Sequence, residues 1–209
     1  MAEVVLPFKY VGGDPAIDLV NTVDWTRHGL KDERLGDYQR LTHWAEGSGV
    51  VSPQLAAKLR RKAAGHPHEA GTVYRASLRA REILRRLLVE LAEGSASAEA
   101  VADFNRILAP VLQHLRVRPL GNAAPRLQLG WDDEENRLES VLWPVLWSAA
   151  SLISSPEASR IRVCGGEDCG WMYVDRSRNG LRRWCQMESC GTREKTRRRR
   201  RGGAAAPRS

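Results

Sequence analysis

Residues 164–190 read CGGEDCGWMYVDRSRNGLRRWCQMESC and contain all four cysteines of the 209-residue chain. Cys164, Cys169, Cys185 and Cys190 form a C-x4-C-x15-C-x4-C array. Each close pair can hold one side of a metal ion, and the spacer brings the second pair to the opposite side. Four thiolates suit zinc and leave no open position for water or substrate, so the array predicts one structural Zn²⁺. Iron, in a rubredoxin-like site or an iron–sulfur cluster, would use the same ligands and stays an alternative.

Basic residues lie within this array in the sequence and follow it toward the C-terminus. Residues 160–209 hold 14 Lys and Arg against 5 Asp and Glu, a net charge of +9, whereas residues 1–159 hold 19 against 20, a net charge of −1. A localised basic field predicts a polyanionic partner for the C-terminal end alone. A solvated polybasic tail is the alternative for residues 197–201. The predicted nucleic-acid contacts are Arg176, Arg178, Arg182, Arg183, Arg193, Lys195, Arg197, Arg198, Arg199, Arg200 and Arg201.

The sequence around the cysteines predicts a small zinc finger over residues 160–201. Residues 160–163 and 170–174 read as two short strands, joined by a turn that contains Gly165-Gly166. Thr192 is predicted to be the N-cap of a helix through the basic run. A last ligand at a helix N-terminus is the layout of a treble-clef-like module. Such a unit has too little apolar surface to fold alone, so the metal would supply much of its stability. Residues 202–209 read as a disordered tail.

Residues 1–155 predict a mainly helical domain with a small antiparallel β-hairpin, an α+β fold. Apolar positions from residue 17 to 25 predict a first helix with Asp14 as N-cap and Pro15 in its first turn. Further helices are predicted over 37–47, from Ser52, over 72–92 and from Ser97. Residues 115–120 and 127–131 alternate as a hairpin does. A last helix over 136–154 contains Pro144, which predicts a kink or a late helix start.

Several classes of function are disfavoured. The N-terminus has neither a basic region nor a long apolar stretch, so no secretory signal is expected. Charges interrupt every apolar segment, so no membrane span is expected, and clustered thiols then indicate metal binding in a reducing cytoplasm. The five histidines form no metalloprotease spacing, and there is no Gly-rich phosphate loop or nucleophile elbow, so an enzyme is not expected.

Asn21 and Thr22 are the candidate ligand-binding residues of the N-terminal domain. They lie within the apolar first helix, and a buried amide needs hydrogen-bond partners. These partners could equally be the neighbouring backbone. A small-molecule effector and a second copy of the chain are the candidate partners of this domain.

The cysteine region resembles the CGNR zinc-finger family, named after the tetrapeptide at its last cysteine. Thr192 stands where that family has Asn, a change that leaves the metal ligands untouched. Residues 16–22 resemble the ABATE domain, which commonly precedes this finger in bacterial proteins. The matching stretches of the finger are residues 175–179, 182–187 and 190–193 with Lys195, and those of the ABATE domain also include Leu41, Trp44 and Phe104-Asn105.

The resemblance implies a stress-linked transcription regulator that binds DNA through the basic residues of its finger. It agrees with the division of charge along the chain. The sequence therefore predicts a bacterial DNA-binding regulator with an N-terminal effector or dimerisation domain. An RNA-binding or ribosome-associated protein that uses the same finger is the alternative.

Overall fold

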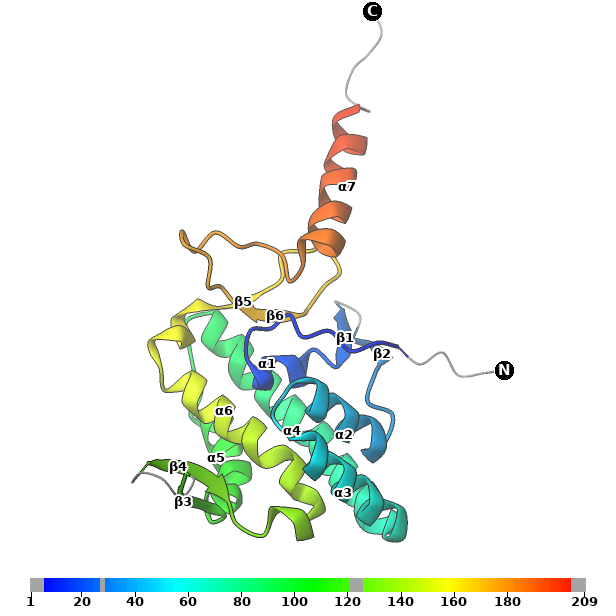
Figure 1. Ribbon diagram of the computed structural model, residues 1–209. Coiled ribbons are helices and arrows are strands. Elements are labelled where there is room, and N and C mark those ends of the chain that lie inside the picture. The colour runs from blue at the N-terminus through cyan, green and yellow to red at the C-terminus, as the bar shows by residue number, and fades with distance from the viewer. Residues whose placement is uncertain (1–5, 27–28, 121–125, 204–209) are drawn as a thin grey trace, which may run out of the picture.

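The computed structural model describes residues 6–26, 29–120 and 126–203 (Figure 1). The strands form separate antiparallel pairs: β1 (Val23–Thr26) with β2 (Gly29–Glu33), β3 (Leu115–Pro119) with β4 (Leu127–Trp131), and β5 (Ile161–Val163) with β6 (Met172–Val174). The helices in these ranges, none of them long and apolar enough to cross a membrane, are α1 (Pro15–Val20), α2 (Tyr38–Gly47), α3 (Pro53–Gly65), α4 (Pro67–Ala92), α5 (Ala98–Leu112), α6 (Trp143–Ile153) and α7 (Thr192–Gly203). The predicted class, mainly helical with a small antiparallel β-hairpin, is confirmed.

Helix starts follow the local sequence. Asp14, Asp37, Ser52 and Ser97 are the N-caps of α1, α2, α3 and α5, and each side chain accepts a hydrogen bond from a backbone N–H of the first turn. These bonds satisfy donors that a helix start leaves without partners. The predicted N-cap Asp14 and the predicted helix starts at Ser52 and Ser97 are confirmed. Helix α4 begins earlier than predicted, at Pro67, since proline fits the first turn of a helix.

The first helix is shorter than its apolar pattern predicts. It ends at Val20, and the prediction that Val23 and Trp25 continue it is wrong, because both lie in β1. Asn21 is the C-cap, and the Trp25 indole Nε1 donates to the Val20 carbonyl at 2.6 Å. This bond satisfies a carbonyl at the helix end and turns the chain into the β1–β2 hairpin, which the sequence did not predict.

Pro144 fixes the start of α6. Single turns of 3₁₀-helix over Glu134–Asn136 and Leu138–Leu142 precede it, and α6 begins at Trp143 with Pro144 in its first turn. A missing backbone N–H costs little there, because the first N–H groups of an α-helix have no partner within that helix. Of the two predicted outcomes, the kink and the late start, the structure has the late start.

One hydrophobic core runs through the helices and into the strands of the cysteine region. Helix α4 contacts α1, α2, α3 and α5 and contributes Leu84, Leu87 and Leu88, all buried. The same core includes Ile161 of β5 and Met172 of β6. Figure 1 shows these strands lying directly over the end of the helical bundle that holds α1. The segments on either side of residue 156 therefore share a core.

A buried amide pair joins these two segments. The Asn21 Nδ2 donates to the Met172 carbonyl and the Met172 N–H donates to the Asn21 Oδ1, both at 2.9 Å. These two bonds match those that a residue of a neighbouring β-strand would make with the Met172 backbone. Nearby, the Trp171 indole donates to the Val23 carbonyl at 3.1 Å, and the Gly170 N–H donates to the Trp25 carbonyl at 2.7 Å. The segment that enters β6 is thus held against the α1–β1 corner.

Candidate metal centre and basic helix

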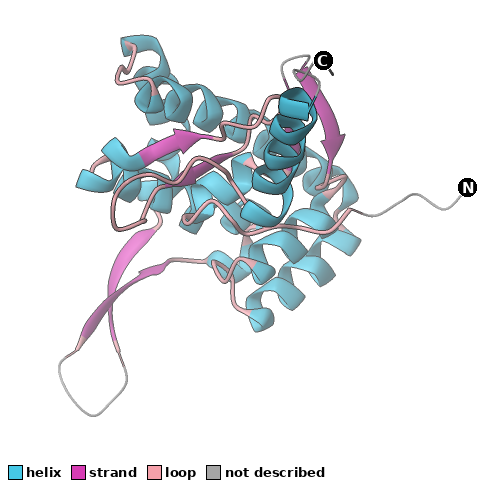
Figure 2. Ribbon diagram, turned by 90° about the horizontal axis from the view of Figure 1, so that it is seen from above, coloured by secondary structure: helices cyan, strands magenta, loops and turns pink. Residues whose placement is uncertain are grey.

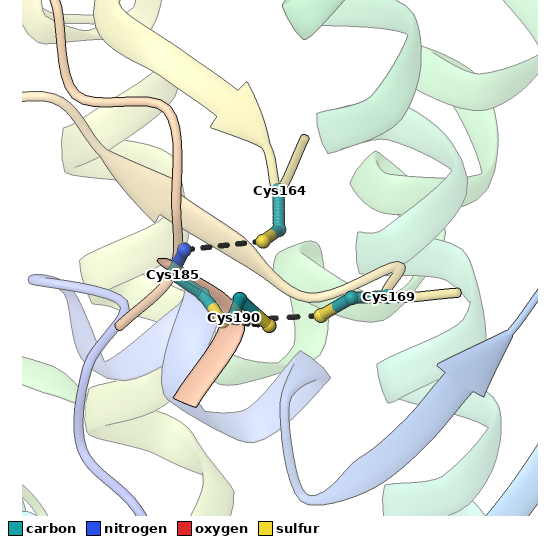
Figure 3. A group of neighbouring side chains, drawn as sticks. All are labelled: Cys164, Cys169, Cys185 and Cys190. Carbon is teal, nitrogen blue, oxygen red and sulfur yellow. Dashed lines mark hydrogen bonds between the residues drawn. The ribbon is translucent and has the colours of Figure 1, made fainter. Parts of the chain in front are cut away.

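The four cysteine side chains converge between β5, β6 and α7 (Figure 3). Cys164 directly follows β5, and the turn after it brings Cys169 back to the same point. Cys185 ends the long loop after β6, and Cys190 lies in a π-helical turn, Met187–Gly191, that leads into α7. Cys169 is half-buried and the other three cysteines are buried. A strand pair with a tight turn, a loop and a helix carrying the last ligand make this a treble-clef-like finger.

The sulfur positions fit a tetrahedral thiolate centre. Zinc–sulfur bonds of about 2.3 Å place the sulfurs of a tetrahedron about 3.8 Å apart. The Cys185 Sγ lies 3.8 Å from the Cys169 Sγ and 3.6 Å from the Cys190 Sγ, and all four sulfurs lie within 4.8 Å of one another. All four cysteines are free thiols, as metal coordination requires. The arrangement supports the prediction of one structural Zn²⁺ held by four thiolates.

Hydrogen-bond donors surround the sulfurs. The Cys185 N–H donates to the Cys164 Sγ at 3.2 Å, and the Arg193 Nη2 donates to the Cys190 Sγ at 3.0 Å. Hydrogen bonds from the Cys169 and Cys185 side chains lower the pKa of Cys164, which favours its thiolate. The bond to Cys190 raises the pKa of Arg193. Because four thiolates would leave a zinc centre with net negative charge, Arg193 compensates part of it from outside the ligand set.

Thr192 is not the N-cap of the basic helix, so this prediction is wrong. Its backbone N–H already bonds to the Met187 carbonyl, and its hydroxyl donates to the same carbonyl at 3.2 Å. The chain is therefore helical from Met187 onward, and Thr192 lies inside a continuous helical segment rather than at its start. At this position the side chain stabilises the π-helical turn that carries Cys190.

Two of the predicted nucleic-acid contacts hold the finger together. Arg176 forms a two-pronged ion pair with Glu157, at 2.7 and 2.8 Å, and donates to the Gly13 carbonyl at 2.6 Å. Arg182 lies over the Tyr173 ring, 4.1 Å from its centroid. It also donates to the backbone carbonyls of Val11, Trp184 and Cys185. These guanidinium groups are occupied within the chain, which the charge pattern alone does not reveal.

The other predicted contacts differ in accessibility. Arg183 is exposed, with its guanidinium 5.3 Å from the Trp184 ring centroid. Arg197 is half-buried and paired with Glu167 and Glu194. The side chain of Arg201 and residues 204–209 of the predicted tail lie outside the described part of the structure, and α7 continues past residue 201 to Gly203. The remaining exposed cations are Arg178, Lys195, Arg198, Arg199 and Arg200.

Helix α7 projects away from the body of the molecule (Figure 1). Its 12 residues span about 18 Å at the usual helical rise. The bonds of Arg193 to Cys190 and of Arg197 to Glu167 tie its first turns to the metal centre. Lys195, Arg198 and Arg199 are three and four residues apart and therefore share a face. The finger thus carries a projecting helix with an exposed cationic face.

Asn21 and Thr22, the predicted ligand-binding pair, are both buried and bonded to the protein. The Asn21 amide pairs with Met172, as described above. The Thr22 hydroxyl donates to the Leu19 carbonyl at 2.7 Å and accepts from the buried Arg81 at 2.9 Å. Their bonds are those of a structural joint, and a role in binding a small molecule stays a prediction.

A cavity of about 470 Å³ lies between the β1–β2 hairpin and the metal centre. Trp25, Trp171 and the buried Arg34 line it from one side, and Cys169 and Arg193 from the other. Arg34 lies over Trp171, 5.1 Å from its ring centroid, and forms an ion pair with Asp24 at 2.9 Å. Sequence reasoning missed this cavity, because it depends on the β1–β2 hairpin.

These features define a zinc-finger protein in which a helical domain and a four-cysteine finger are packed on one core. The chain belongs to the ABATE family, described as "Putative stress-induced transcription regulator", whose model matches residues 13–156. The model of the CGNR zinc finger matches residues 160–201. Both resemblances seen in the sequence are confirmed, and the two families are regulator and zinc-finger types rather than enzymes. A search of curated proteins finds no match to this chain.

Proposed function

We propose that this protein is a bacterial transcription regulator that binds DNA through α7, in the cytoplasm, where reducing conditions keep its thiols available for zinc. The observation that carries the proposal is the exposed cationic face of α7, projecting from a finger whose cysteines fit a metal centre. The major groove of B-DNA is about 12 Å wide and accepts an α-helix.

The exposed cations are suited to contact phosphates on either side of that groove. Arg198, Arg199 and Arg200 lie on α7, while Arg178 and Arg183 lie on the loop before Cys185. Phosphate contacts position a protein on the duplex, and base-edge contacts add sequence specificity. Arg176 and Arg182 are proposed to support this surface through their internal bonds instead of touching DNA.

The test is fluorescence anisotropy with the zinc-loaded full chain, genomic DNA fragments and structured RNA over a range of salt concentrations. If about six exposed cations engage phosphate, log K should fall against log salt with a slope of about −5. Replacing Arg198, Arg199 and Arg200 by Ala should reduce the slope to about −2 to −3. The matched control replaces three exposed arginines far from the finger, Arg61, Arg75 and Arg79, and should leave the slope unchanged.

Each outcome has a clear meaning. A selected genomic fragment bound no more tightly than random polymer at physiological salt contradicts sequence-specific regulation. Tighter binding to structured RNA than to any DNA favours the RNA-binding alternative. Equal losses in the α7 and control variants would show that net charge alone, and not α7, determines binding.

We also propose that a small-molecule effector acts in the cavity between the β1–β2 hairpin and the metal centre. A ligand in this cavity would touch both the N-terminal domain and the first turn of α7. The volume of the cavity is in the range of small-molecule sites. The test is a set of small carboxylates and amines screened by tryptophan fluorescence and by DNA affinity. Arg34→Met should abolish any response, and a response that survives unchanged places the effector elsewhere.

A further inference from the structure

The β3–β4 hairpin carries an apolar face and a polar face. Residues that are directly opposite each other in the register point to the same side of a hairpin. Leu115 pairs with Trp131, Val117 with Leu129 and Pro119 with Leu127, whereas Arg116 pairs with Gly130 and Arg118 with Gln128. Apolar residues thus cover one face from the base to the far end of the described strands.

Most of this apolar face is open to solvent. Leu127 is 69% exposed, Val117 64% and Leu129 52%. Figure 2 shows the hairpin extending beyond the helices, where the described residues provide no cover. An isolated two-stranded hairpin is only marginally stable in water, and a row of exposed aliphatic side chains on one usually marks an interaction site.

The base of the hairpin is firmly anchored. Trp131 packs on Trp143 with ring centroids 5.9 Å apart, and His114 stacks on the same Trp143 at 4.2 Å. The Asp132 N–H donates to the His114 carbonyl at 2.8 Å. The apolar face is therefore presented in a fixed position, which lowers the entropic cost of binding a partner.

The size of the face fits a second copy of the chain. Its exposed apolar side chains amount to roughly 450 Å² per copy, so a symmetric pair would bury about 900 Å², and the flanking polar side chains bring the total near the ~1,200 Å² of a small stable interface. The ends of the described chain lie on other sides of the molecule (Figures 1 and 2). They are therefore poorly placed to cover the face.

The charges beside the hairpin are largely paired within the chain. Asp132 pairs with Arg116 at 3.7 Å and with Arg118 at 3.3 Å, and Asp133 pairs with Arg137. Arg116 and Arg118 alternate along β3 with the apolar residues, so they lie on the opposite, polar face. Two copies can therefore bring their apolar faces together without placing like charges against each other, as a two-fold interface requires.

We propose that this face binds the same face of a second copy of the chain, which gives a two-fold dimer with Val117 and Leu129 at its centre. The finger and α7 lie at the other end of the molecule from the hairpin (Figure 1). Both basic helices therefore stay accessible in the dimer. Dimeric regulators use such an arrangement to bind two half-sites of one operator.

The experiment is light scattering after size exclusion, with sedimentation equilibrium, on the zinc-loaded full chain. The wild type should have twice the 23.4 kDa mass of one chain at tens of micromolar. Val117→Thr with Leu129→Thr should raise the dimer dissociation constant at least tenfold, because threonine keeps strand propensity and removes apolar surface. Gln128→Thr, on the polar face of the same strand, is the matched control and should dimerise as the wild type does.

Zinc content and circular dichroism establish that every variant is folded. A wild type that stays monomeric overturns the proposal, and so does a double variant that dimerises as well as Gln128→Thr. Mass is measured without nucleic acid, so a failure of DNA binding would not alter this result. A dimer that forms while DNA binding fails would instead refute the proposed function alone.

Discussion

Replacing Asn21 by Ala removes the amide that pairs with both backbone groups of Met172. Asn21 is 1% exposed and Met172 is fully buried, so water cannot readily substitute for the lost partner. A buried donor or acceptor left without a hydrogen bond costs about 1–3 kcal/mol, and the variant leaves one of each. We therefore expect the free energy of unfolding to fall by about 3 kcal/mol, a large part of the 5–15 kcal/mol typical of a whole domain.

Urea unfolding in the presence of excess zinc, followed by tryptophan fluorescence, measures this loss. With a slope of about 2 kcal/mol per molar urea, the midpoint should fall by about 1.5 M. Asn105→Ala is the matched control, because Asn105 is exposed on α5, and it should change stability by no more than about 0.5 kcal/mol. A loss below about 1 kcal/mol for Asn21→Ala would refute the reasoning that this amide joins the two segments.

Asn21→Asp gives a second measure of the same pair. The carboxylate can still accept from the Met172 N–H, but its other oxygen faces the Met172 carbonyl, which offers no proton. Two acceptors held together and a buried charge should make this variant at least as unstable as Asn21→Ala at neutral pH. If it is as stable as the wild type, the donor half of the pair contributes nothing.

Three further predictions concern the metal centre and a buried carboxyl. Cys185→Ser should lower bound zinc from one ion per chain to well below one, as measured by elemental analysis, with loss of the fixed environment of Trp184. Arg193→Ala should speed zinc transfer to a chelator about tenfold, since partners outside the ligand set typically tune affinity by that order. Burial raises the pKa of Asp18 to about 6, so the folded state holds a proton that the unfolded state releases near pH 4. The resulting stability is present below pH 4 and lost as pH rises through 6, so the wild type should lose about 3 kcal/mol relative to Asp18→Asn from pH 4 to 7.

These predictions have simple controls. Lys195→Ala removes a cation from the same turn of α7 without touching a sulfur, and it should release zinc at the wild-type rate. Unchanged release from Arg193→Ala would contradict the role of its bond to Cys190. Equal pH profiles for the wild type and Asp18→Asn would show that the carboxyl is not desolvated in solution. Zinc retained at full stoichiometry by Cys185→Ser would contradict the four-thiolate centre.

The sequence was most informative where chemistry depends on nearby residues of one type. The metal centre follows from the spacing of four cysteines, and helix starts follow from residues such as Asp14 and Ser97, whose side chains reach only their own first turn. The N-cap prediction for Thr192 was wrong because it also rested on the local sequence alone. Threonine is a good N-cap, but the π-helical turn before it had already begun the helix.

What the sequence could not give depends on partners far along the chain. Helix α1 stops where Asn21 meets Met172, 151 residues later, so the helical pattern running on to Trp25 was misleading. On charge alone, Arg176 and Arg182 are as good candidates for nucleic-acid contacts as Lys195. Only the fold shows that Glu157 and backbone carbonyls already bind the guanidinium groups of the first two.

The common core also bears on how such a protein can change over evolution. The two family models meet between residues 156 and 160, yet Ile161 and Met172 pack among residues of the preceding helices. The finger is therefore not an independent module that can be moved to another protein by itself. A chimaera that moves the finger to another domain would also need the residues around Asn21. Loss of the metal would destabilise the helical domain as well.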